Sequence, residues 1–166
     1  GRQRGEHPIP INIPAGVSTG QYMHLRGVGN AGARGGPRGD LVVLFDVDDD
    51  ERFERDGEDL YTEVLLTFPQ VVRGADVEVA GIAGPITLHI PPGTQSGQVF
   101  QLRGRGLPRV NASGTGDLHV RVQLWTPTDL TADERRVIDE LAKVHSPVPV
   151  NRNKGFWAKM KEALGA

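Results

Sequence analysis

The chain has 166 residues, with 19 Lys and Arg, 21 Asp and Glu, and a formal net charge of −2. That balance argues against nucleic acid as a partner, because phosphate binding needs a concentrated basic surface. The absence of cysteine excludes disulfides and thiolate metal sites and suits a reducing compartment. No apolar run approaches the roughly 20 residues of a membrane span, so no membrane partner is expected. The 22 glycines and 12 prolines favour short strands joined by many turns.

The first part of the chain predicts three short strands. Ile9, Ile11 and Ile13 alternate with polar residues or proline, as in a strand, and "PAG" then makes a turn. The strand "QYMHLRG" follows, and after a glycine-rich loop comes "LVVLFDV". This last strand is apolar on both faces, because Val42 and Leu44 add to its apolar positions. Either another part of the domain buries the second face, or that face is a groove for a partner.

The second part predicts further strands. Residues 59–68, "DLYTEVLLTF", alternate in hydrophobicity, and residues 75–81, "ADVEVAG", add a short strand. Strands at 86–90 and 98–104 follow. In "LHVRVQLW" the apolar side chains face one way and the polar ones the other, which predicts a half-buried antiparallel strand.

One phrase occurs twice in the chain. "IPAGVSTGQYMHLRGVG" (13–29) and "IPPGTQSGQVFQLRGRG" (90–106) align at an offset of 77 residues with nine identities in seventeen positions. "GDL" recurs at the same offset. The repeat predicts two related domains in tandem. The strands before the second copy have no counterpart before the first, and the chain begins without Met. We therefore expect a truncated first domain and a piece of a longer protein.

The remaining residues change to a helical pattern. Thr131 followed by Glu134 predicts a capping box, and an apolar helical stripe follows it. A second short helix is predicted in "KGFWAKMKEALGA". Such a short helix is marginal alone, so it must pack either on its own domain or on a second copy of the chain. Its apolar side consists of Phe156, Trp157, Met160 and Leu164.

Three motifs resemble ligand-binding or adhesion motifs, but their sequence context argues against each function. "GVGNAG" matches the dinucleotide pattern, but "ARGGPRGD", which follows it, cannot form the helix that would meet a pyrophosphate. "DVDDDERFERDGE" lacks the Gly and Glu that a calcium loop starting at Asp46 requires. "RGD" is matched by "TGD" in the second copy, which indicates turn chemistry. We find no metal-ligand spacing and no catalytic constellation, and expect neither a metal site nor an enzyme.

Taken together, these pieces resemble the C-terminal half of the DnaJ family of J-domain co-chaperones, over nearly the whole chain. The resemblance is carried by "INIPAGVSTGQYMHLRGVGNAG" with "GDLVV", by "FERDGEDLYTEVLLTFPQVVRGADVEV", and by "IPPGTQSGQVFQLRGRGLP" with "GTGDLHVRV". The tail segments "TPTDLTADERRVIDEL" and "KGFWAKMKEAL" complete it.

The resemblance implies a mainly β fold with two tandem β-sandwich-like domains, the first truncated, and a short helical C-terminal tail. The implied boundaries are 1–52 for the second part of the first, client-binding domain, 53–128 for the second β-domain and 129–166 for the helical tail and dimerisation segment. The family's zinc-binding cysteine-rich domain and its J-domain would lie upstream. No cofactor is therefore expected in this chain.

The resemblance also implies a function in protein folding and the stress response in the cytoplasm. In the family, an apolar groove of the first β-domain binds unfolded client polypeptides, which pass to the ATP-driven chaperone DnaK. The matching groove positions are Ile9 and Val43, with Ile11 beside Ile9; Val42 and Leu44 are the alternatives from the residue pattern.

Partner copies are implied as well. The tail would form a homodimer through the four apolar residues Phe156, Trp157, Met160 and Leu164. The alternative is that the chain is a structural spacer and dimerisation unit, with client binding located in the missing N-terminal part.

Overall fold

The computed structural model describes residues 8–144 and 148. The chain is divided into two compact units, Gly1–Thr126 and Pro127–Ala166. The first unit consists of strands in several sheets with one short helix, which confirms the predicted mainly β fold. The boundaries predicted inside the chain stay predictions. The predicted dimerisation residues Phe156, Trp157, Met160 and Leu164 lie outside the described residues.

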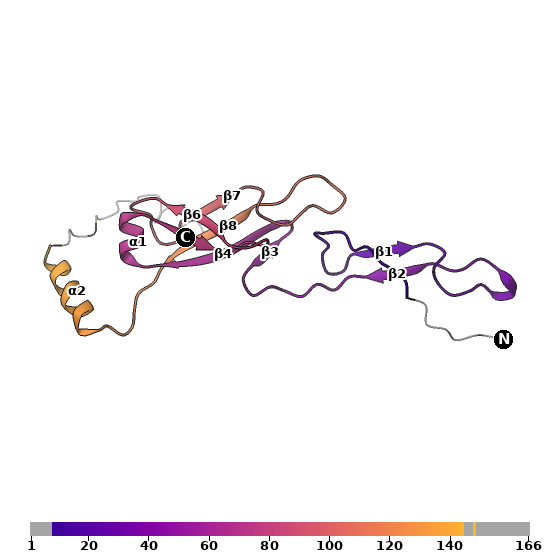
Figure 1. The fold of residues 1–166 in the computed structure, drawn as a ribbon, viewed down its shortest axis with the longest axis horizontal. Coiled ribbons are helices and arrows are strands. Elements are labelled where there is room, and N and C mark those ends of the chain that lie inside the picture. The colour runs from indigo at the N-terminus through magenta and orange to yellow at the C-terminus, as the bar shows by residue number, and fades with distance from the viewer. Residues whose placement is uncertain (1–7, 145–147, 149–166) are drawn as a thin grey trace, which may run out of the picture. The chain divides into compact units, whose positions relative to one another are not determined.

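The first copy of the repeat forms a β-hairpin (Figure 1). Strand β1, Tyr22–Leu25, pairs antiparallel with β2, Leu41–Leu44. A single 3-10 turn, η1 (Ala33–Gly35), lies in the loop between them. Both strands were predicted, although β2 is shorter than the pattern indicated.

The strand predicted from Ile9 to Ile13 is wrong. This segment carries no strand assignment, and among the described residues no backbone hydrogen bond joins it to a neighbouring strand. The equivalent segment of the second copy, β6 (Ile86–Ile90), pairs with β5 (Ala75–Val79) directly before it. The described chain has no such strand ahead of Ile9, and an extended segment without a partner is not part of a sheet.

The second copy belongs to a complete four-stranded sheet. In spatial order its strands are β3 (Glu54–Asp56), β4 (Asp59–Leu66), β8 (Leu118–Leu124) and β7 (Val99–Leu102). β8 pairs antiparallel with β7, as predicted, but parallel with β4. The prediction of a purely antiparallel strand was therefore half correct. Alternating hydrophobicity reports which face is buried, and it does not distinguish the direction of a neighbour.

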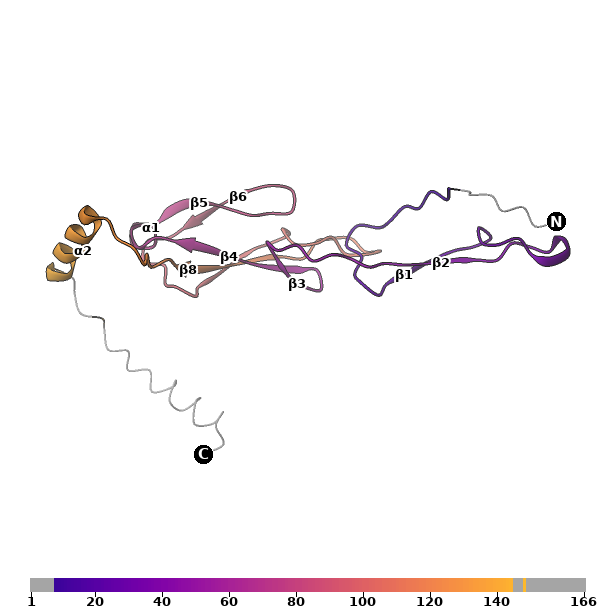
Figure 2. The ribbon, with the colours of Figure 1, turned by 90° about the horizontal axis from the view of Figure 1, so that it is seen from below.

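The β5–β6 pair forms a second layer over this sheet, as Figure 2 shows. Apolar side chains from both layers meet in one core, which makes this part of the chain a β-sandwich. The predicted inward face of β8 is confirmed, because Leu118, Val120 and Val122 are each 0% exposed. The buried core consists of Leu60, Leu66, Val71, Val79, Leu88, Ile90, Leu118, Val120 and Val122.

A short helix, α1 (Phe68–Arg73), was missed by the sequence analysis. The predicted strand at 59–68 ends at Leu66, and Phe68 is the first helical residue rather than a strand residue. The Gln70 side-chain carbonyl accepts a 2.9 Å hydrogen bond from the Thr67 backbone N–H. Thr-x-x-Gln with proline in the first turn is a helix-start pattern, and it was the signal in the sequence that could have located α1.

The repeated Gly-Asp pairs close two equivalent turns. Oδ1 of Asp40 accepts a hydrogen bond from the Gly27 N–H at 2.9 Å, and Oδ1 of Asp117 accepts one from Gly104 at 2.7 Å. Both glycines have positive φ, 69° and 67°, which a side chain would oppose. The predicted turn role of this motif is confirmed. It fixes where the second strand of each copy begins.

Asp117 gives its turn a dependence on pH. The hydrogen bond from the Gly104 N–H, and after it that from Gln101, hold the pKa of the Asp117 carboxyl below its ordinary value of 3.8. Because the pKa is lower in the folded state, the ionised carboxylate stabilises the fold at any pH above the pKa of the unfolded state. This stabilisation is lost as the pH falls through the pKa of the folded state. We expect Asp117→Ala to lower the thermal unfolding midpoint at neutral pH, and the difference from wild type to narrow below pH 3.8. Calorimetry across the acid range measures this, and a difference independent of pH would contradict it.

Arg55 fastens the two copies together. From β3 its guanidinium donates hydrogen bonds to the carbonyls of Gly16 and Val17 at 2.8 and 2.9 Å and to Oγ of Ser18 at 2.7 Å. A Cβ at Gly16 would collide with the carbonyl oxygen of Pro108, so glycine permits this close approach. The "PAG" turn of the first copy is thus held against the second.

We expect Arg55→Ala to lower the free energy of unfolding by about 2 kcal/mol, because hydrogen bonds to a charged donor are lost and their acceptors are left partly buried. Hydrogen exchange should rise most at Ser18, whose N–H lies in the released turn. Arg105→Ala, which truncates an exposed arginine, is the matched control. Equal denaturation curves for the two variants would refute this role for Arg55.

The second unit contains helix α2, Ala132–Val144. The predicted capping box is confirmed: the Thr131 N–H donates to Oε2 of Glu134 at 2.8 Å, and the Glu134 N–H donates to Oγ1 of Thr131 at 3.2 Å. The hydrogen bonds that Oε2 of Glu134 accepts, first from the Thr131 N–H and then from the Thr131 hydroxyl, hold the pKa of the Glu134 carboxyl below its ordinary value. Within this unit no residue of the helix is buried, and its apolar stripe consists of Val137, Ile138, Leu141 and Val144.

Candidate polypeptide-binding surface

One face of the β1–β2 hairpin is apolar and exposed. The register places Tyr22 opposite Leu44 and His24 opposite Val42, so these four side chains share a face. Their exposed fractions are large for apolar residues: 63% for Tyr22, 55% for Val42 and 70% for Leu44. The His24 ring lies edge-on to Tyr22 at 5.3 Å. We call these four residues the hairpin face.

Two of the four residues of the hairpin face were predicted from the sequence. Val42 and Leu44 were the alternatives that the residue pattern offered, whereas Tyr22 and His24 were not singled out. Their signal was present: they alternate with Met23 and Leu25 in a strand whose partner was recognisable. Side chains alternate between the two faces in each strand, and the register of the hairpin brings Tyr22 and His24 of β1 onto the same face as Val42 and Leu44 of β2.

The three predicted groove positions lie in two places. Val43 sits opposite Met23 on the other face of the hairpin, where it is half-buried. Ile9 and Ile11 belong to the unpaired extended segment and are 36% and 38% exposed. Their part in binding stays a prediction.

The equivalent face of the second copy has a different chemistry. At the offset of 77, Tyr22, His24, Val42 and Leu44 correspond to Val99, Gln101, His119 and Arg121. His119 stacks on Tyr61 at 4.7 Å and lies 3.6 Å from an Asp59 oxygen, and Arg121 lies 3.5 Å from Glu63. The backbone repeats, and His119 and Arg121 replace the apolar Val42 and Leu44, whereas Val99 keeps the position of Tyr22 apolar and is 52% exposed.

The hairpin also has an open edge. The N–H of Phe45 donates to the carbonyl of Gln21, the residue before β1, so alternation turns the backbone groups of Val42 and Leu44 away from β1. In the second copy the same side of β8 pairs with β4. Among the described residues no strand pairs with β2 on this side. The edge offers unpaired backbone donors and acceptors beside exposed apolar side chains.

The hairpin face holds no chemistry-bearing cluster. Within the described residues no group of His, Asp or Glu is placed to hold a metal ion. The loop after β1 continues into a single 3-10 turn instead of the helix that a dinucleotide site requires. Of the helices described, none combines the length and the hydropathy that a membrane crossing needs. An apolar side-chain row beside an open strand edge is suited to binding an extended polypeptide.

Comparison with known proteins relates the chain to one family. A family model described as the DnaJ C terminal domain matches residues 2–127. "Chaperone protein DnaJ" of Shouchella clausii is 48% identical over 94% of this chain and 42% of the relative, and that of Halalkalibacterium halodurans is 44% identical over 99% and 44%. "Chaperone protein DnaJ" of Salinibacter ruber is 45% identical over 99% of this chain and 43% of its own length. The chain thus spans less than half the length of these relatives, and it belongs to the DnaJ C-terminal domain family.

Proposed function

We propose that this chain is the polypeptide-binding part of a DnaJ-type co-chaperone. The observation that carries the proposal is the hairpin face, where the first copy exposes Tyr22, Val42 and Leu44 and the second copy has His119 and Arg121 in place of Val42 and Leu44. The family and its chaperone relatives support it.

The bound segment is an extended, apolar stretch of an unfolded chain. Such a stretch exposes apolar side chains and unpaired backbone groups, and the hairpin offers partners for both. Its side chains pack on Tyr22 and Leu44, while its backbone pairs with the open edge of β2. Ile9 and Ile11 are further predicted positions on the segment before the hairpin, and Val43 lies on its opposite face.

The client then passes to a DnaK-type chaperone. A single exposed apolar face binds weakly, because association must offset the loss of translational and conformational freedom. Weak binding suits a protein that releases its client to an ATP-driven partner. The relatives that carry the name "Chaperone protein DnaJ" support this role.

The second copy supplies the substitutions that test the hairpin face. Val42→His with Leu44→Arg installs the residues found at the equivalent positions His119 and Arg121, on a backbone that accepts them in the second copy. We expect the affinity for a fluorescein-labelled apolar peptide to fall about tenfold or more, since about 1.4 kcal/mol of apolar contact is removed. Fluorescence anisotropy measures the affinity.

Leu65→Ser is the matched control, because Leu65 is 56% exposed on the outer face of the second copy. It should leave peptide affinity unchanged. Ile9→Ser with Ile11→Ser, and Val43→Ala, test the predicted groove positions in the same assay. If no hairpin or groove variant weakens binding, the chain acts as a spacer and dimerisation unit and the proposal is wrong.

Dimerisation is part of the proposal and is tested separately. Two linked copies raise avidity through effective concentration, without any new contact. We expect sedimentation equilibrium to show a dimer for the full chain, and a folded monomer for a chain ending at Pro149 or carrying Phe156→Ala with Trp157→Ala. A dimer that survives both changes would place the contact elsewhere.

A further inference from the structure

A second surface lies at the joint between the two copies. It is a cavity of about 460 Å³ with walls from the first copy, the connecting segment and the second copy. Thr19 contributes from the first copy and Val47 from the connecting segment, while Phe53, Ile82 and Leu107 contribute from the second copy. We call this cavity the joint groove.

The walls of the joint groove are held in place. Arg55 binds the turn that precedes Thr19, as described above. Oγ1 of Thr19 accepts a 2.9 Å hydrogen bond from the Val47 N–H and donates to the Val47 carbonyl at 3.3 Å. These bonds connect all three parts of the wall, so little conformational freedom is lost when a ligand enters.

The floor of the joint groove is apolar and accessible. Ile82 is 48% exposed and Val47 is 39% exposed, and Phe53 and Leu107 are half-buried. A cavity of this kind accepts an aliphatic or aromatic side chain.

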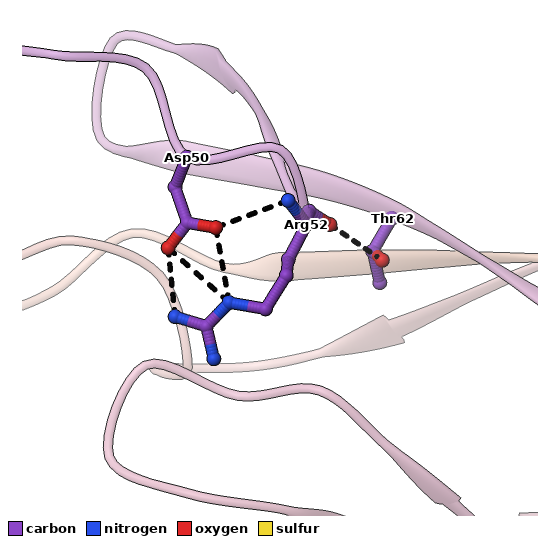
Figure 3. A network of polar contacts seen from close by, with 3 residues as sticks. All are labelled: Asp50, Arg52 and Thr62. Atoms are coloured by element: carbon purple, nitrogen blue, oxygen red, sulfur yellow. Dashed lines mark hydrogen bonds and ion pairs between the residues drawn. The ribbon is translucent and has the colours of Figure 1, made fainter.

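The rim of the joint groove is negatively charged. Residues 46–51 contain five carboxylates. Arg52 neutralises one of them: its Nη2 lies 2.7 Å and its Nε 3.0 Å from the two carboxylate oxygens of Asp50, as Figure 3 shows. Hydrogen bonds from Arg52 lower the pKa of Asp50 to about 2.

Two of the rim carboxylates are available to a ligand. In the part of the chain that the structure describes, Asp48 and Asp49 have no ion pair and no side-chain hydrogen bond. The guanidinium of Arg55 is directed at the carbonyls of Gly16 and Val17 instead. An incoming cationic group therefore meets unpaired carboxylates directly beside the apolar floor.

We propose that the joint groove binds a polypeptide segment in which an apolar side chain is followed or preceded by Lys or Arg. The apolar side chain enters between Val47 and Ile82, and the cation pairs with Asp48 or Asp49. This inference rests on the proposed function and adds to it a second site with a different preference. The hairpin face selects for apolar character, and the joint groove selects for charge.

The test compares two fluorescein-labelled peptides with one apolar core, flanked by Lys in the first and by Glu in the second. Asp48→Asn with Asp49→Asn should weaken the Lys-flanked peptide about fivefold, as expected for two partly exposed ion pairs. It should flatten the salt dependence of binding and leave the Glu-flanked peptide unchanged or slightly tighter. Asp129→Asn with Asp139→Asn changes the net charge equally outside the groove and should have no effect.

Ile82→Ser tests the floor, and circular dichroism with thermal unfolding verifies that each variant is folded. We expect Ile82→Ser to weaken the Lys-flanked peptide as well. Unchanged affinity of that peptide in both groove variants would overturn the joint groove. If, in that case, Val42→His with Leu44→Arg still weakens the binding of both peptides, the proposed function stands and only the joint groove is rejected. A wild-type chain that binds neither peptide would overturn both.

Discussion

The arrangement of this molecule depends on whether a strand has a hydrogen-bonding partner on each side. β8 has β7 on one side and β4 on the other, and its inward side chains Leu118, Val120 and Val122 are completely buried. β2 has β1 alone among the described strands, and it exposes Val42 and Leu44. The segment at Ile9 has no strand partner among the residues that the structure describes, and it forms no strand. Pairing therefore determines where the core lies and where apolar surface is left accessible.

Two copies of one backbone have acquired different surfaces. The Asp–Gly bonds at Asp40 and Asp117 hold the same turn in both copies, so the strands that follow present equivalent positions. In the second copy those positions carry His119, which lies near Asp59, and Arg121, which pairs with Glu63. In the first copy they carry apolar residues. Keeping the turn while changing the side chains at two positions changes the chemistry of the face without altering the fold.

Sequence reasoning recovered what depends on spacing and missed what depends on long-range contact. The offset of 77 located both copies, and Thr131 with Glu134 located the start of α2, because these signals are local. The parallel position of β4 could not be read, since alternation is the same beside either kind of neighbour. The strand at Ile9 was over-predicted, because hydrophobic alternation is necessary for a sheet strand but does not supply its partner. The joint groove is assembled from three separated segments, so no single stretch of sequence announces it.

Arg55 has a mechanical consequence. Its guanidinium holds Gly16, Val17 and Ser18 through parallel hydrogen bonds, while the covalent connection between the copies runs separately through residues 46–52. A force that separates the two copies therefore acts on two attachments, the Arg55 hydrogen bonds and the connecting segment. Those bonds share the force, since they end on one rigid planar group. Separation of the two copies therefore requires the Arg55 bonds to break, while residues 46–52 still keep the copies connected.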